Sequence, residues 1–145
     1  MNVLPRPMDV LPHRSPFLFV DELARLEPGV SAAGTWTLTG DEVFFPGHFP
    51  GRPTLPGVLM CEAIAQVGAI AVLTDERFRG KLPLFGGVDR ARFRRQVAPG
   101  DTLWLEVELG RMSARAGRGS GRALIGGADG DLACSCDLLF VVVDA

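Results

Sequence analysis

Residues 57–76 read GVLMCEAIAQVGAIAVLTDE, and this run decides the fold. A Pro-Gly pair opens the run, as at many helix starts, and no further proline follows for about 20 residues. Between residues 58 and 73 the only strongly polar side chains are Glu62 and Gln66, so the segment lacks the polar face of a surface helix. We therefore expect a helix that begins near Gly57 and is buried on all sides.

Strand-like segments lie on both sides of this run. FLFVDELARLE (17–27) and GTWTLTG (34–40) predict a first hairpin around Glu-Pro-Gly. Turn-forming residues separate the later segments, which are expected to be antiparallel strands: LPLFGGVDRARFRRQV (82–97), TLWLEVELGRMS (102–113), GRALIGGA (121–128) and LACSCDLLFVVV (132–143). No repeat or linker composition appears. We expect one α+β domain over residues 1–145, with an antiparallel sheet of about six strands wrapped around one long buried helix.

The composition limits the class of protein. A chain of 145 residues with 47% hydrophobic and 22% charged residues is large enough to bury a core and is expected to be globular. No segment approaches the roughly 20 apolar residues that span a membrane, and the amino terminus lacks a leader pattern, so we expect a cytoplasmic protein without membrane insertion. Cys61, Cys134 and Cys136 cannot all pair with one another and lack a second pair of metal ligands, which predicts free thiols and no metal site.

Glu62 is the only carboxylate in the apolar part of the expected helix. An unpaired ionised carboxylate is costly in an apolar interior, so Glu62 either finds partners or stays protonated, as an acid. Gln66 lies one turn further on, on the same face, where its amide can hold the carboxyl group. The alternative is a structural glutamate that pairs with an arginine or caps a loop, and the helix alone leaves both interpretations open.

His48 lies in PGHFPGRP (46–53), where prolines and glycines stiffen the backbone and can position a side chain. A lone histidine on a loop is often structural, yet a neutral imidazole is a common general base and a carboxylic acid complements it. The first N–H groups of the helix, at Gly57 and Val58, can polarise a carbonyl oxygen. Base, acid and oxyanion site together predict proton removal beside a carbonyl group, with loss of a group further along.

Three motifs then carry a family resemblance: LPHRSPFLFVD, FFPGHFPGRPTLPGVLMCEAIAQ and GGVDRARFRRQVAPGD, in this order within residues 9–110. The chain resembles the FabZ-type (3R)-3-hydroxyacyl-[acyl carrier protein] dehydratases, which have the hot-dog fold. The resemblance implies that His48 is the base, Glu62 the acid and Gly57 the backbone donor to the thioester carbonyl. It implies dehydration of (3R)-3-hydroxyacyl thioesters to trans-2-enoyl thioesters in fatty acid or related lipid or polyketide biosynthesis, with no metal or redox cofactor.

The resemblance also implies an assembly and a partner. We expect a homodimer or a trimer of dimers, in which His48 and Glu62 of one site come from different subunits. The partner is an acyl carrier protein with a phosphopantetheine-linked substrate, and we assign Val58, Gln66 and Phe49 to substrate binding. The related isomerases carry aspartate at the helix position, so Glu62 favours a plain dehydratase. The alternatives are a hot-dog thioesterase or isomerase, and a catalytically silent module that binds acyl carrier proteins.

Arg90, Arg92 and Arg94 recur at every second residue and are expected to share one face of a strand. They are interpreted as substrate-binding residues in a docking patch for the acidic carrier, or alternatively as a solvated face. Nucleic acid is not expected as a partner, because the net charge is −2 and aromatic residues interleave with these arginines only once.

His13, in LPHRSP, is interpreted as structural, because the flanking prolines suggest a turn and no carboxylate is near in the sequence. The chain has no tyrosine, and Ser15 and the pair Leu84-Phe85 stand where members of the resembled family commonly have one.

Overall fold

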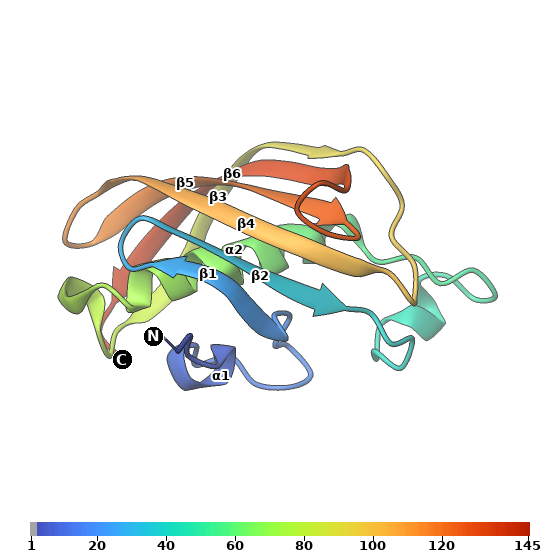
Figure 1. Ribbon diagram of the computed structural model, residues 1–145, viewed down its shortest axis with the longest axis horizontal. Coiled ribbons are helices and arrows are strands. Elements are labelled where there is room, and N and C mark those ends of the chain that lie inside the picture. Colours follow the sequence, from blue (N-terminus) through green and yellow to red (C-terminus); the bar gives the residue numbers. More distant parts are fainter. Residues whose placement is uncertain (1–2) are drawn as a thin grey trace.

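The structure, a computed structural model, describes residues 3–145 and shows one antiparallel sheet curled around a central helix (Figure 1). The strands are β1 (Glu22–Glu27), β2 (Ser31–Thr37), β3 (Leu82–Phe93), β4 (Thr102–Met112), β5 (Ala116–Ile125) and β6 (Asp131–Val143). The helices are α1 (Pro7–Val10), α2 (Gly57–Leu73) and the short 3-10 helices η1 (Phe45–Gly47) and η2 (Glu76–Phe78). The six strands lie in the order β1-β2-β4-β5-β6-β3, which confirms the predicted α+β hot-dog architecture.

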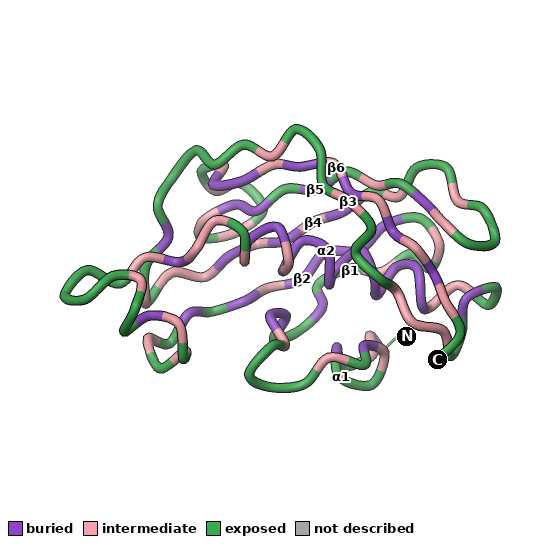
Figure 2. Tube along the Cα trace, turned by 180° about the vertical axis from the view of Figure 1, so that it is seen from behind, coloured by how far each residue is buried: buried purple, intermediate pink, exposed green. Residues whose placement is uncertain are grey.

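The central helix α2 begins at Gly57, as predicted, and every residue from Ala63 to Leu73 is buried. Figure 2 shows the same burial along the helix, whereas most residues of β1 and β3 are exposed. The helix ends at Leu73, three residues before residue 76, because Asp75 is extended and caps η2 by accepting a hydrogen bond from the N–H of Arg77 (3.0 Å). A helix of this length supplies the apolar surface that the curved sheet covers.

The sheet packs directly on the backbone of α2 at Gly68. A methyl group added there would lie 2.7 Å from Cζ of Phe140 on β6, so only glycine allows this approach. The three cysteines, Cys61 on α2 and Cys134 and Cys136 on β6, are buried in the same core. All three are free thiols, as predicted.

Two strand boundaries differ from the expected ones. Residues 17–21 do not form a strand, because the N–H of Phe19 donates to Oε1 of Gln66 (2.8 Å) instead of to a neighbouring strand. The Gly/Arg-rich stretch before residue 121 was expected to be a connection, but it is the first half of β5. Glycine is needed in this strand, because a methyl group at Gly121 would lie 2.3 Å from Cγ2 of Ile64 on α2.

Within residues 3–145, no helix combines the length and the apolar character needed to cross a membrane.

Candidate active site

The amino terminus of α2 is open. Pro56 occupies the N-cap position, and no side chain of the described residues caps the helix there. The first N–H groups of a helix have no intrahelical acceptor, so those at Gly57 and Val58 can bind an anionic or partly negative oxygen. The side chain of Val58 is 71% exposed beside them. This arrangement supports the predicted oxyanion site.

Phe93, at the end of β3, packs against this helix start. A methyl group on Gly57 would lie 2.8 Å from Cδ1 of the Phe93 ring, so glycine is required for close contact between β3 and α2. The ring is nevertheless 51% exposed. Sequence reasoning did not select Phe93 as a site residue, because no local pattern distinguishes it from the other phenylalanines.

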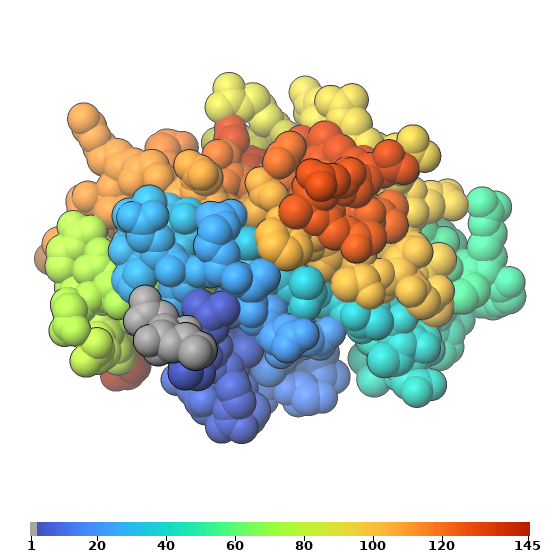
Figure 3. Space-filling model, viewed as in Figure 1, coloured from blue at the N-terminus to red at the C-terminus, as the bar shows by residue number. Residues whose placement is uncertain are grey.

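His48 follows η1 and is held by its own loop. Its Nδ1 lies 2.7 Å from the carbonyl oxygen of Thr54, and the N–H of Thr54 donates back to the carbonyl of His48 (2.8 Å). A carbonyl oxygen only accepts hydrogen bonds, so Nδ1 carries a proton, and Nε2 holds the lone pair whenever the ring is neutral. The ring also stacks on Phe49, with centroids 4.0 Å apart. The contact with Thr54 leaves Nε2 of His48 available for other partners. Figure 3 shows the following residues, 50–53, at the edge of the molecule, projecting from its body.

Glu62 lies on α2 with its side chain 19% exposed. Its Oε2 accepts a hydrogen bond from Nε2 of Gln66 (2.9 Å), which confirms the predicted contact one helical turn away. The orientation of the amide is determined by its other partners. Because the N–H of Phe19 must donate to Oε1 of Gln66, the amide nitrogen faces Glu62 and the carbonyl oxygen of Phe17 (2.9 Å). Within residues 3–145 the side-chain partners of Glu62 are Gln66 and His13, and no arginine pairs with it.

His13 lies beside this carboxyl group. Its Nε2 is 3.7 Å from Oε2 of Glu62, although 49 residues separate the two in the chain. Burial lowers the pKa of His13 from its ordinary value, and the negative charge of Glu62 opposes this shift. His13 was interpreted as structural because no carboxylate is near it in the sequence. The structure places it beside a carboxylate that is distant in the sequence, because the segment after α1 passes over α2 at Glu62.

A cavity of about 200 Å³ opens at this cluster. Ala65 and Ala69 line it from the helix face that also carries Glu62 and Gln66, and Leu84 and Phe85 line it from β3. The cavity therefore has polar groups beside an apolar wall, which suits a chain whose reacting end is polar. The Leu84-Phe85 pair thus contributes apolar wall where a tyrosine is common in the resembled family.

One chain does not bring all the predicted catalytic residues together. Within the part of the chain that the structure describes, Glu62 lines the cavity and His48 does not. No hydrogen bond joins His48 to Glu62 among these residues either. Within residues 3–145 no group of three or more His, Cys, Asp or Glu side chains is arranged to hold a metal ion.

The expectation that Arg90, Arg92 and Arg94 share one face of a strand is wrong. The pairing of β3 with β6 shifts register between Asp89 and Arg92, and Arg90 adopts a left-handed backbone conformation with φ of 51°. β3 then ends at Phe93, so Arg94 lies beyond the strand.

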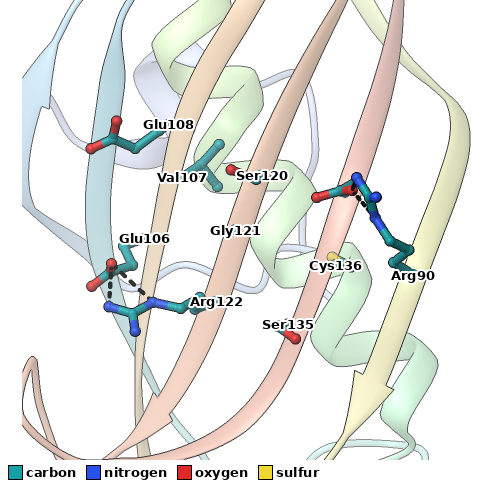
Figure 4. Close-up of a pocket in the computed structure, with 10 residues that line it drawn as sticks. Arg90, Glu106, Val107, Glu108, Ser120, Gly121, Arg122, Ser135 and Cys136 are labelled. Atoms are coloured by element: carbon teal, nitrogen blue, oxygen red, sulfur yellow. Dashed lines mark hydrogen bonds and ion pairs between the residues drawn. The ribbon is translucent and has the colours of Figure 1, made fainter.

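Arg90 has an ion-pair partner on the outer face of the sheet. Figure 4 shows Arg90 directed from β3 toward β6, where it forms an ion pair with Asp137. Arg122 on β5 forms a second pair with Glu106 on β4 (2.8 Å) on the same face. Arg90 is thus neutralised locally, and Arg92 and Arg94 have no ion-pair partner among the described residues.

Comparisons with known proteins show the family and the fold of this chain. The model of the FabA-like domain matches residues 11–136. The protein named 3-hydroxyacyl-[acyl-carrier-protein] dehydratase FabZ from Moorella thermoacetica is 53% identical over 92% of this chain and 91% of its own. The protein of the same name from Staphylococcus epidermidis is 48% identical over 94% of this chain and 92% of its own.

Solved structures share the fold at much lower identity. The dehydratase heterocomplex ApeI:P from Xenorhabdus doucetiae matches with a TM-score of 0.79 at 17% identity, covering 97% of this chain and 91% of that one. A hypothetical thioesterase with coenzyme A from Streptococcus pneumoniae matches with a TM-score of 0.64 at 10% identity, covering 85% of each chain. The structural likeness shows the fold, and the sequence matches over nearly the whole length show that the chain belongs to the FabA-like family, together with relatives named FabZ.

Proposed function

We propose that the protein is a hydro-lyase that removes water from (3R)-3-hydroxyacyl thioesters carried by an acyl carrier protein and forms trans-2-enoyl thioesters in fatty acid or related lipid biosynthesis. The relatives that match over nearly the full length carry the name of this activity. The observation that carries the proposal is a loop histidine with a free Nε2 together with a glutamate held at a cavity with an apolar wall.

In the proposed mechanism His48 Nε2 takes a proton from the carbon next to the thioester carbonyl. The N–H of Gly57 stabilises the negative charge that develops on the carbonyl oxygen. Glu62 then donates a proton to the departing hydroxyl group, which leaves as water, and the carbon–carbon double bond forms. Val58, Phe49 and Gln66 border these groups, and we assign them to substrate binding. The proton taken by His48 returns to Glu62 through solvent between turnovers.

A complete site requires a second subunit in this proposal. β3 is the last strand of the sheet and pairs with β6 alone among the described residues, so its other edge is free. This strand exposes Leu84 (49%), Phe85 (38%) and Val88 (44%), which is an unusual apolar content for a sheet edge in water. We propose that two chains associate along β3, which joins His48 of one protomer to Glu62 of its partner, and that such dimers assemble further into a trimer of dimers.

The three free thiols support a reducing compartment, and we propose the cytoplasm as the location. We also propose that the chain acts as one catalytic domain.

A direct assay tests the proposed activity. The purified protein should convert 3-hydroxyacyl thioesters of several chain lengths to enoyl thioesters, followed by the absorbance of the enoyl group, without added metal or redox cofactor. Release of free thiol without enoyl product would instead indicate a thioesterase. Binding of acyl carrier protein without any turnover would indicate a silent binding module.

The docking of the carrier is tested at Arg92 and Arg94. Replacing both with glutamate should raise the apparent KM for carrier-bound substrate by roughly 10-fold at low salt, because charges at a docking surface govern encounter and orientation. In the wild type the same KM should rise with ionic strength as the Debye length falls below about 10 Å. A small thioester without the carrier should show neither effect.

The matched control is the double variant Arg111→Glu with Arg115→Glu. Arg111 lies near the end of β4, and Arg115 immediately precedes β5. The start of β5 pairs with β6 at Val141, whereas Phe93 pairs with β6 at Cys134, near the other end of that strand. The control makes the same change in net charge and should leave both KM values unchanged. Equal losses on both substrates for the Arg92 and Arg94 variant would show that these arginines support the fold or the substrate cavity, which would contradict the docking proposal.

A further inference from the structure

His13 is a part of the site that the proposed mechanism does not use. Its side chain is 22% exposed, and it lines the same cavity as Glu62 and Gln66. Its two ring nitrogens have different surroundings. Nε2 faces Oε2 of Glu62 at 3.7 Å, whereas Nδ1 is buried and has no hydrogen-bond partner within residues 3–145.

The unpartnered nitrogen identifies the tautomer. Burial lowers the pKa of His13, so the ring is neutral near pH 7 and carries one N–H group. A buried N–H without an acceptor is rarer and more costly than an unused lone pair. The proton therefore lies on Nε2, where it points toward the carboxyl group of Glu62.

Two N–H donors then converge on one oxygen of Glu62. Gln66 donates to Oε2 at 2.9 Å, and Nε2 of His13 approaches the same atom. The distance of 3.7 Å is longer than a hydrogen bond, and such contacts in active sites commonly tighten when substrate binds. In a protonated carboxyl group one oxygen accepts hydrogen bonds and the other carries the proton. When the carboxyl group of Glu62 carries a proton, donors at Oε2 make this atom the accepting oxygen and place the proton on Oε1.

We propose that His13 is a positioning residue that, together with Gln66, selects Oε1 of Glu62 as the oxygen that delivers the proton to the departing hydroxyl group. This inference rests on the proposed dehydratase function. His13 touches neither the substrate nor the reacting atoms in this role. It keeps the acid proton off Oε2, the oxygen that Gln66 and His13 approach.

Two substitutions separate the N–H group of His13 from its bulk. His13→Leu keeps most of the side-chain volume but removes the N–H donor. It should lower kcat by about 10-fold, because the acid proton of Glu62 then lies on the wrong oxygen in part of the molecules. KM should change by less than about twofold. His13→Gln places an amide N–H near the position of Nε2 and should restore kcat to within about threefold of the wild type. Full activity of the Leu variant, or equal losses in both variants, would overturn the proposal.

A double-mutant comparison distinguishes positioning from a merely structural role. In a Glu62→Gln background, where no acid proton remains, His13→Leu should cause no further loss of kcat beyond about twofold. The same 10-fold factor in both backgrounds would mean that His13 supports the fold and not Glu62, and it would refute the inference.

A measurement without turnover keeps the inference separate from the proposed function. Nitrogen-15 NMR of the folded protein should find the proton of His13 on Nε2 and none on Nδ1. The opposite tautomer would overturn the positioning role, whatever the activity. An inactive wild type with all thioesters would refute the proposed function alone, while the tautomer would still decide the geometry at Glu62.

Discussion

His48→Ala and Glu62→Gln each lower kcat on a 3-hydroxyacyl thioester by about 100-fold or more, as expected for loss of a general base or a general acid. The histidine change removes the free Nε2 that the contact with Thr54 leaves available. The glutamate change keeps the size of the side chain and its place beside Gln66, but it removes the transferable proton. Initial rates of enoyl formation at saturating substrate measure both effects.

The matched control for the second substitution is Glu108→Gln on the exposed face of β4. It makes the same chemical change outside the cavity and should keep the wild-type kcat. Circular dichroism and thermal melting of all three variants should match the wild type, since His48 is only half-buried and Glu62 is partly exposed. Near-wild-type turnover in either the His48 or the Glu62 variant would show that the mechanism is wrongly assigned.

Mixing the two inactive variants should restore activity if each site combines residues of two subunits. A dimer with one His48→Ala chain and one Glu62→Gln chain has one site with both defects and one site with neither. Random exchange makes half of the dimers mixed, so the mixture should recover roughly a quarter of the wild-type activity. This rise from nearly zero is large enough to measure with the same absorbance assay.

Two controls are needed to interpret the recovery of activity. Each variant incubated alone under the exchange conditions should stay inactive, and mass-tagged chains should show by native mass spectrometry that mixed dimers form. If mixed dimers form and no activity returns, each site lies within one chain. That outcome would contradict the proposed association along β3 as the source of a complete site.

The sequence was informative where local chemistry decides the structure. The Pro-Gly pair and the apolar run predicted the start of α2 at Gly57, and the helical repeat predicted the contact of Glu62 with Gln66. The stiff loop predicted that His48 is positioned, and the structure shows its contact with Thr54. Each of these contacts joins residues that are close in the chain, so short-range backbone geometry is sufficient to infer them.

The sequence was misleading where a strand departs from its regular repeat. Alternation predicted a common face for Arg90, Arg92 and Arg94, but the register shift in β3 and the ion pair with Asp137 separate Arg90 from the others. A bulge of this kind depends on how two strands fit across the whole sheet, and no pattern of alternating residues reveals it. The glycines of β5 misled for a related reason, because the close approach of Gly121 to Ile64 exists only in the packed molecule.

By itself the sequence determined the class of fold and the central helix, and it singled out His48 and Glu62 as the residues of the proposed mechanism, since apolar periodicity and residue chemistry are local properties. Only the tertiary structure decided the surroundings of Glu62. It brought His13 within 3.7 Å of the carboxyl group and oriented the Gln66 amide through the backbone of Phe19. The physical reason is that the segment after α1 packs across the helix and brings together groups that lie far apart in the chain. Once these groups are buried, each polar atom can bind only the partners that this packing places beside it.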